Sequence, residues 1–183
     1  SSDMLSAMSD LFISLSGTEL KADQVNLYDF SGYVLEAGIS TIVKKTDGSK
    51  DEWIEVAREL EGKKVLTPPY CTREYTKTAT YDQWFISLYR SFNNQYKRGV
   101  GVIETAKQCK SVFKSIITYK KKNHEDAASI YVFDSNGDLI YPYDISQEYK
   151  AALQPYYELT KGDDSALTFI SPLTGKTEYA AEA

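Results

Sequence analysis

Apolar and polar positions alternate in blocks along the chain and predict a mixed helix and strand domain. Met4, Met8, Leu11 and Leu15 recur on one helical face, so a helix is predicted over residues 1–22. The runs "QVNLYDF" and "GYVLEAGI" that follow are short and rich in aromatic and aliphatic residues. Such runs, separated by a Ser-Gly break, predict two paired strands.

A second helix is predicted after the turn at Asp47 and Gly48. Ser49 and Glu52 match the S-x-x-E capping box, in which a serine side chain caps the first turn. The apolar positions behind them recur at helical spacing up to Gly62. They are Trp53, Val56, Ala57 and Leu60.

Three more strands are predicted, with the sequences "KKVLTPP", "QWFISLYRSF" and "GVGVIET". A long polar loop follows Cys71, and a turn lies near residues 93–99. The order helix, two strands, helix, three strands is that of a PAS-like module, an antiparallel sheet with helices on its faces. The predicted fold class is therefore α+β.

The chain from Cys109 onward has the pattern of a helix followed by a hairpin. Apolar residues between Cys109 and Ile117 mark one face of the helix, which ends in the lysines of residues 120–122, where cations suit a helix C-terminus. The stretch "SIYVFDSNGDLIYPYD" then predicts two strands joined by a turn at residues 134–137, and Pro142 ends the pairing or marks an edge.

This order of elements resembles the double Cache extracellular sensors of bacterial receptors, especially those of sensor histidine kinases. The stretches "WFISLYRSFNNQYKRGVGVIETAKQCKSVFKSI" and "YVFDSNGDLIYPYD" carry the resemblance in sequence. It implies a membrane-distal PAS-like module over residues 23–108, a connecting helix over 109–126 and a smaller, Cache-like proximal module over 127–183. Because "ALTFISPLTGKTEYAAEA" supplies one strand and the beginning of another, we expect the proximal module to be truncated.

Composition and charge limit the classes of partner that this chain is expected to bind. The net charge of −5 gives no basic face for nucleic acid, and 42% hydrophobic residues are ordinary for a globular domain. No apolar run approaches the ~20 residues of a membrane-spanning helix, and the start has neither a signal peptide nor a methionine. We therefore expect an excised piece of a receptor that is tethered to the outer face of the bacterial membrane.

Motifs for metals and phosphates are incomplete. Asp134, Asn136 and Asp138 alternate as calcium ligands do in an EF-hand, but Gly137 stands fourth instead of sixth and Ile145 holds the twelfth position. The "TGKT" at residues 174–177 lacks the first glycine of a P-loop, whose place is held by Ile170. Neither a metal nor a cofactor is predicted.

Catalytic patterns are weak as well. His124 is the only histidine, its setting "KKNHED" is polar, and no nucleophile-elbow pattern is present. This chain is therefore not predicted to be an enzyme, although the full-length protein would be a kinase.

The only two cysteines are Cys71 and Cys109. In PAS-like strand order they lie two strand spacings apart, roughly 10 Å, beyond the ~7 Å that a disulfide tolerates. We therefore expect two separate thiols. The alternative is a disulfide, which needs the loop after Cys71 to bring the two residues closer together.

The resemblance implies a ligand site in the distal module, in the region "TPPYCTREYTKTATYDQWFISLYRSF". Its aromatic and guanidinium side chains suit a small polar or anionic ligand. Amino-acid-binding members of the family carry Arg-x-Trp-Tyr, whereas this chain has Asp82, Gln83, Trp84 and Phe85, so amino-acid sensing by that motif is not predicted. The alternative is that these residues are core or surface. The candidates are Tyr70, Arg73, Tyr75, Tyr81, Trp84, Tyr89 and Arg90.

The predicted function is the extracellular sensor of a two-component histidine kinase. Ligand would bind in the distal module, and the signal would pass through the N-terminal helix, which could also pair two chains as a homodimer. The alternatives are the sensor of a chemotaxis receptor or of a diguanylate cyclase, and a stand-alone secreted enzyme.

Overall fold

The computed structural model describes residues 22–30, 32–38, 43–45, 48, 50–72, 83–93, 99–123, 129–160, 166–171 and 175–181. The chain divides into two compact units, one up to Val112 and one from Phe113 onward. The helix predicted over residues 1–22 lies outside the described ranges apart from its last residue. No helix in these ranges is both long and apolar enough to cross a membrane.

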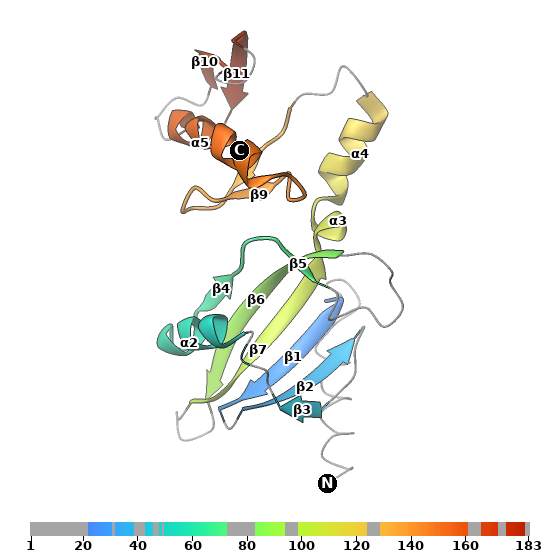
Figure 1. The fold of residues 1–183 in the computed structure, drawn as a ribbon, viewed down its shortest axis with the longest axis vertical. Helices are drawn as coiled ribbons and strands as arrows, with labels where there is room; N and C mark the ends of the chain where they lie inside the picture. The colour runs from blue at the N-terminus through green and yellow to red at the C-terminus, as the bar shows by residue number, and fades with distance from the viewer. Residues whose placement is uncertain are drawn as a thin grey trace. The chain divides into compact units, whose positions relative to one another are not determined.

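The first unit is built on an antiparallel sheet, which has seven strands within the described ranges (Figure 1). Six strands follow the order β3-β2-β1-β7-β6-β4, and β5 pairs with β6 beyond the end of β4. The last strand of this unit therefore lies at the centre, with β6 between it and β4, as PAS-like strand order predicts. The strands are β1 (Gln24–Asp29), β2 (Tyr33–Gly38), β3 (Val43–Lys45), β4 (Lys64–Leu66), β5 (Tyr70–Thr72), β6 (Gln83–Asn93) and β7 (Gly99–Gln108).

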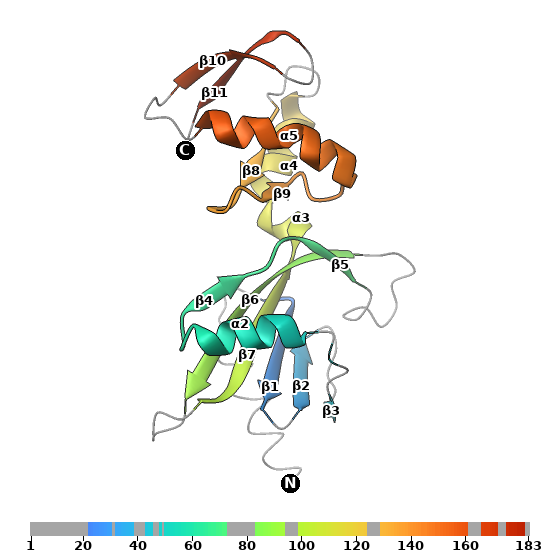
Figure 2. The ribbon, with the colours of Figure 1, turned by 60° about the vertical axis from the view of Figure 1, so that its left-hand side comes forward.

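Helix α2 (Asp51–Glu59) lies across one face of this sheet (Figure 2). Ile54 and Ala57 are buried there against strand residues, with Trp53 partly buried beside them. The predicted apolar face included Leu60 instead of Ile54, and this was wrong. Leu60 is the C-cap residue and is 37% exposed. The strand residues of this core are Tyr28, Val34, Tyr89 and Val102.

The start of α2 also differs from the prediction. Lys50 is the N-cap residue, and its side chain makes no capping hydrogen bond. Ser49, on which the predicted capping box depends, lies outside the described residues. The side chain of Lys50 approaches the buried Glu104 of the sheet and forms an ion pair with it.

The helix predicted after the sheet is divided into two. Strand β7 continues to Gln108, and α3 (Cys109–Val112) follows it in the first unit. Helix α4 (Lys114–Asn123) begins after Phe113 and belongs to the second unit. Cys71 is exposed and Cys109 is buried, and the two form no disulfide, as the strand order predicts.

The second unit contains the predicted hairpin, with β8 (Val132–Phe133) and β9 (Leu139–Tyr141). Its turn is held by Asp134, whose Oδ1 accepts hydrogen bonds of 2.9 Å from the backbone N–H groups of Asn136 and Asp138. Gly137 has a φ of +91°, which its lack of a side chain permits. The predicted turn chemistry is therefore confirmed.

The rest of the second unit was only partly expected. Helix α5 (Gln147–Thr160), which was not predicted, buries Leu153 and Tyr156 against Leu139. Strands β10 (Ala166–Ile170) and β11 (Thr177–Ala181) form a separate antiparallel hairpin. The second of them is thus a full strand, where only the beginning of one was predicted.

Candidate functional site

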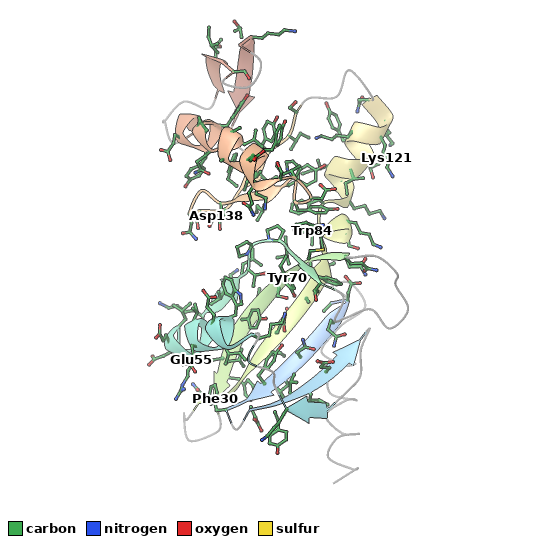
Figure 3. All side chains as sticks on the ribbon, viewed as in Figure 1. Phe30, Glu55, Tyr70, Trp84, Lys121 and Asp138 are labelled. Atoms are coloured by element: carbon green, nitrogen blue, oxygen red, sulfur yellow. The ribbon has the colours of Figure 1, made fainter. Side chains whose placement is uncertain are left out.

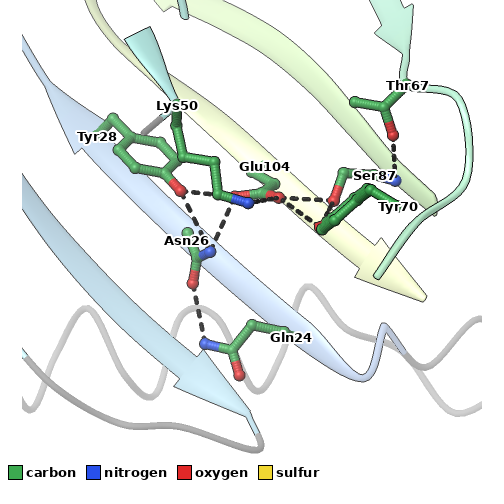
Figure 4. A network of polar contacts seen from close by, with 8 residues as sticks. All are labelled: Gln24, Asn26, Tyr28, Lys50, Thr67, Tyr70, Ser87 and Glu104. Atoms are coloured by element: carbon green, nitrogen blue, oxygen red, sulfur yellow. Dashed lines mark hydrogen bonds and ion pairs between the residues drawn. The ribbon is translucent and has the colours of Figure 1, made fainter. Parts of the chain in front are cut away.

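A network of polar side chains lies buried on the sheet face that α2 covers (Figure 4). Gln24, Asn26 and Tyr28 occupy alternate positions of β1, so all three side chains point to this face. Neighbouring strands and loops supply the other members. We call this set the Glu104 network, and it consists of Gln24, Asn26, Tyr28, Lys50, Thr67, Tyr70, Ser87 and Glu104.

Glu104 is the centre of the network and is fully buried. Its Oε2 accepts hydrogen bonds from Asn26 Nδ2 at 2.9 Å and from the Tyr28 hydroxyl at 2.6 Å. Its Oε1 accepts from Ser87 Oγ at 2.6 Å and from the Tyr70 hydroxyl at 3.3 Å. Each carboxylate oxygen therefore has two donors, which lie on β1 for Oε2 and on β5 and β6 for Oε1.

The network extends outward from these contacts. Gln24 Nε2 donates to Asn26 Oδ1 at 2.9 Å, and Thr67 Oγ1 accepts the backbone N–H of Ser87 at 3.0 Å. The hydroxyls of Tyr70 and Ser87 are 2.6 Å apart. Either hydroxyl can be the donor in that bond, since each carries one proton and each also lies within hydrogen-bonding distance of Glu104 Oε1.

Lys50 connects the network to α2. Its Nζ lies 3.9 Å from Glu104 Oε1 and 4.6 Å from the centre of the Tyr70 ring. The Lys50 side chain is 15% exposed, whereas that of Glu104 has no exposure. Lys50 is also the residue before the first turn of α2, so the ion pair joins that helix to the central strand of the sheet.

The network determines the charge of Glu104. Burial is the largest single effect and by itself would raise the pKa of this carboxyl. The charge of Lys50 and the hydrogen bonds from Ser87, Tyr28 and Asn26 lower the pKa, and together they outweigh the effect of burial. The pKa therefore lies below its ordinary value of 4.5, and Glu104 is ionised at neutral pH. Burial, followed by the charge of Glu104, raises the pKa of the Tyr28 hydroxyl far above its usual range, so it remains a donor.

Aromatic rings pack beside the polar groups. Tyr89 lies between Tyr28 and Trp53, with ring centres 6.4 Å and 6.3 Å away and nearly parallel planes. Tyr70 contacts Phe85 with ring centres 6.4 Å apart. The network therefore borders aromatic surface, as binding sites for small polar molecules commonly do.

The predicted ligand residues that the structure describes lie on two opposite faces of the sheet. Tyr70 belongs to the network, and Tyr89 is buried on the same face beside it. Trp84 and Arg90 occupy the other set of alternate positions along β6 from Tyr89 and point to the other face, so they do not join these two. Tyr70 and Trp84 are labelled in Figure 3. Arg90 is exposed, and its Nε donates to the carbonyl of Gly62 at 2.6 Å. Arg73, Tyr75 and Tyr81 lie outside the described residues.

Most members of the network were not predicted from the sequence, including Glu104, Lys50 and Asn26. A signal was present, because "QVNLYD" places polar residues at alternate positions of a strand. That pattern usually marks the solvent face of a sheet. Only the covering of that face by α2 shows that here the polar positions are inside. Within the described ranges, no group of three metal-ligating side chains comes together.

No protein-family model and no curated protein matches the sequence of the chain. Solved structures match its fold. The extracellular domain of rpHK1S-Z16, assigned as a histidine kinase, is 18% identical, with 97% of this chain and 76% of that one covered and a TM-score of 0.60. The periplasmic sensory domain of the Campylobacter jejuni chemoreceptor Tlp1 is 14% identical, with 97% and 72% covered and a TM-score of 0.60.

A third similar structure is the ligand-binding domain of the Campylobacter jejuni chemoreceptor Tlp3 in complex with L-norvaline. It is 16% identical, with 94% of this chain covered and a TM-score of 0.56, and the chain spans 62% of its length. These three structures are sensor domains, not catalytic domains. The matches confirm the resemblance to PAS-like extracellular sensors at the level of the fold.

Proposed function

We propose that this chain, which has the fold of periplasmic and extracellular sensor domains of bacterial receptors, is the extracellular ligand-sensing domain of a membrane-tethered receptor. The output of that receptor is a histidine kinase. The observation that carries the proposal is the Glu104 network, a charged and aromatic centre enclosed beneath α2 in this fold. Polar and charged groups gathered beside aromatic rings suit the recognition of a small polar ligand, which supports a binding role.

The ligand is a small polar molecule that reaches the network through Lys50 and Tyr70, in the first unit. These two residues support this site because neither is fully buried, whereas Glu104, Ser87 and Asn26 are. Of the described residues that were predicted from the sequence, Tyr70 and Tyr89 interact with the charged centre. The Tyr70 hydroxyl donates to Glu104, and burial followed by the charge of Glu104 raises the pKa of Tyr89. Trp84 and Arg90, on the opposite face, are left out of the proposed site.

Binding would act by a population shift. Lys50 precedes α2, and its backbone carbonyl accepts the N–H of Ile54 at 3.0 Å. A ligand that changes the contact between Lys50 and Glu104 therefore favours one position of α2 over another. Transmission from the sheet through the helix predicted over residues 1–22, paired with its copy in a homodimer, completes the proposal.

A chemotaxis receptor is the second candidate output. The likeness to the Tlp1 and Tlp3 domains favours it, since the TM-score of Tlp1 equals that of the kinase sensor. Both outputs use the same type of sensor. The output domain encoded in the same gene distinguishes them.

A thermal-shift screen of the purified chain against sugars, carboxylates and amino acids tests the sensor function. A ligand at 100 times its Kd stabilises a protein by about 2.7 kcal/mol, which raises Tm by roughly 5–10 °C for a chain of this size. Tyr70→Phe should weaken the response to the ligand that is found, because it removes the hydroxyl that bonds Ser87 and Glu104.

The matched control for Tyr70→Phe is Arg90→Ala, on the opposite face of β6. We expect this variant to keep the full ligand response. The proposed site is wrong if Arg90→Ala loses the response and Tyr70→Phe keeps it. The proposed function is wrong if no compound of these three classes stabilises the chain.

A further inference from the structure

Lys50 occupies the position in the Glu104 network that suits a positively charged group. Its ammonium lies beside the carboxylate of Glu104 at 3.9 Å and over the ring of Tyr70 at 4.6 Å. A carboxylate together with an aromatic ring is the combination with which proteins bind ammonium groups of ligands. In this chain the ammonium comes from the protein itself.

We propose that Lys50 is a resident cation that determines ligand specificity: it fills the ammonium position of the site and excludes ligands that carry an ammonium group. The inference rests on the proposed function, because it concerns the ligand class of the same site. It assigns to the natural ligand a polar molecule without an amine, and free amino acids are then not ligands.

The charges around Lys50 support this assignment. Glu36 of β2 is also buried on the face beneath α2, and it pairs in register with Asn26, which in turn pairs with Glu104. Glu36 and Glu104 thus lie on the same face of the sheet, on strands separated by β1, and Lys50 is the cation that contacts Glu104. While Lys50 is in place, an incoming ammonium meets a like charge at the position that it would need. Without Lys50, the same position becomes attractive to a cation.

The attachment of Lys50 makes its displacement costly. Its carbonyl accepts the first hydrogen bond of α2, and its side chain is mostly buried. A ligand amine could therefore take its position only by disturbing the start of α2. Ligands that carry an ammonium group are therefore excluded, and this exclusion depends on the side chain of Lys50.

Chemical rescue tests the inference without the natural ligand. Lys50→Ala removes three methylenes and the ammonium, a fragment that propylammonium supplies from solution. We expect Lys50→Ala to lower Tm and propylammonium chloride to restore it saturably, by about 2 °C or more. Equal concentrations of 1-propanol and of sodium chloride control for shape and for ionic strength. Wild-type chain should respond to propylammonium no more than to sodium chloride.

Two variants serve as controls for the site. Lys64→Ala removes an exposed lysine of β4 and should show no saturable response. The double variant Lys50→Ala with Glu104→Gln removes the carboxylate and should lose the rescue. If Lys50→Ala does not fold alone, refolding in propylammonium should recover its circular dichroism spectrum, and refolding in propanol should not.

The inference is overturned if Lys50→Ala responds to propylammonium no more than Lys64→Ala, if propylammonium fails to recover an unfolded Lys50→Ala, or if the wild type shows the same saturable response. A different pair of results would contradict the proposed function and leave the inference standing: propylammonium restores Lys50→Ala, and no compound in the ligand screen stabilises the chain. A natural amine ligand bound with Lys50 in place would overturn the inference and leave the sensor function standing.

Discussion

At the scale of single residues, Glu104 shows how neighbours outweigh burial. Its carboxylate has no exposure, yet Lys50 and the donors on β1 and β6 hold its pKa below the ordinary value. Charge-assisted hydrogen bonds in a dry environment are stronger than those at a surface. The folded state therefore depends on the ionised form of this one group.

The pH dependence of stability should report this directly. Because the pKa of Glu104 is lower in the folded than in the unfolded chain, the unfolded chain binds more protons between the two values. The contribution of Glu104 to stability is complete above 4.5, the ordinary pKa, and is lost as the pH falls through the folded pKa. We expect Glu104→Gln to cost about 3 kcal/mol at pH 7, and this cost should shrink in acid.

Urea unfolding of both proteins, at pH 7 and at steps down to about pH 3, measures this difference. Glu55→Gln is the matched control, since Glu55 is an exposed carboxylate on α2 and bonds only to Arg58 among the contacts described. A difference between wild type and Glu104→Gln that stays constant with pH would contradict the assignment of an ionised Glu104.

At the scale of elements, the central strand pair β1 and β7 depends on a close approach at Gly101. A Cβ added to this residue would lie 2.3 Å from the carbonyl oxygen of Tyr28 and 2.9 Å from the ring of Phe92. The first of these atoms is backbone and cannot move without shifting β1. The glycine lets β1 pair closely enough with β7 for Asn26 and Tyr28 to reach Glu104.

Gly101→Ala should therefore destabilise the first unit by about 2–3 kcal/mol, as overpacking of a well-packed site does. Gly62→Ala provides the comparison. Gly62 has a φ of +90°, but its added Cβ would meet no atom closer than 3.7 Å, so only the cost of the left-handed conformation, about 1 kcal/mol, applies. Urea midpoints of the two variants decide the matter, and equal losses would argue against the steric explanation.

At the scale of the whole molecule, the two units have separate apolar cores. Ile54, Ala57 and Tyr89 belong to the core of the first, and Leu139 and Leu153 to that of the second. The Glu104 network lies entirely in the first unit. Stability changes in the second unit should therefore leave the network intact.

Leu153→Ala tests this separation. Leu153 is fully buried, so its truncation should cost about 2–5 kcal/mol in the second unit. Hydrogen exchange should then become faster in α5 and β9, while the amides of β1, β6 and β7 keep their protection. Gln154→Ala, at an exposed position of α5, is the control. Equal loss of protection in β7 would show that the two units unfold together.

The sequence by itself determined the order of the longer described elements of the first unit and the turn of the hairpin. Both depend on local physics. The period of apolar residues identified α2 and the long strands β6 and β7, and the turn at Asp134 and Gly137 needs particular side chains within a few residues. Short β3 and β5 and helix α5 were missed, because three-residue strands and a helix with an internal Pro155 give weak periodic signals.

The tertiary structure alone decided where the candidate site lies. Tyr70 and Trp84 look equivalent in sequence, yet the strands place them on opposite faces. Gln24 and Asn26 have the pattern of a solvent face but are buried, on the face of the sheet that packs against α2. Lys50 and Glu104 are 54 positions apart in the sequence, the difference between 104 and 50. They come together only when α2 packs on β7. Contacts between distant residues depend on packing, and no local pattern encodes them.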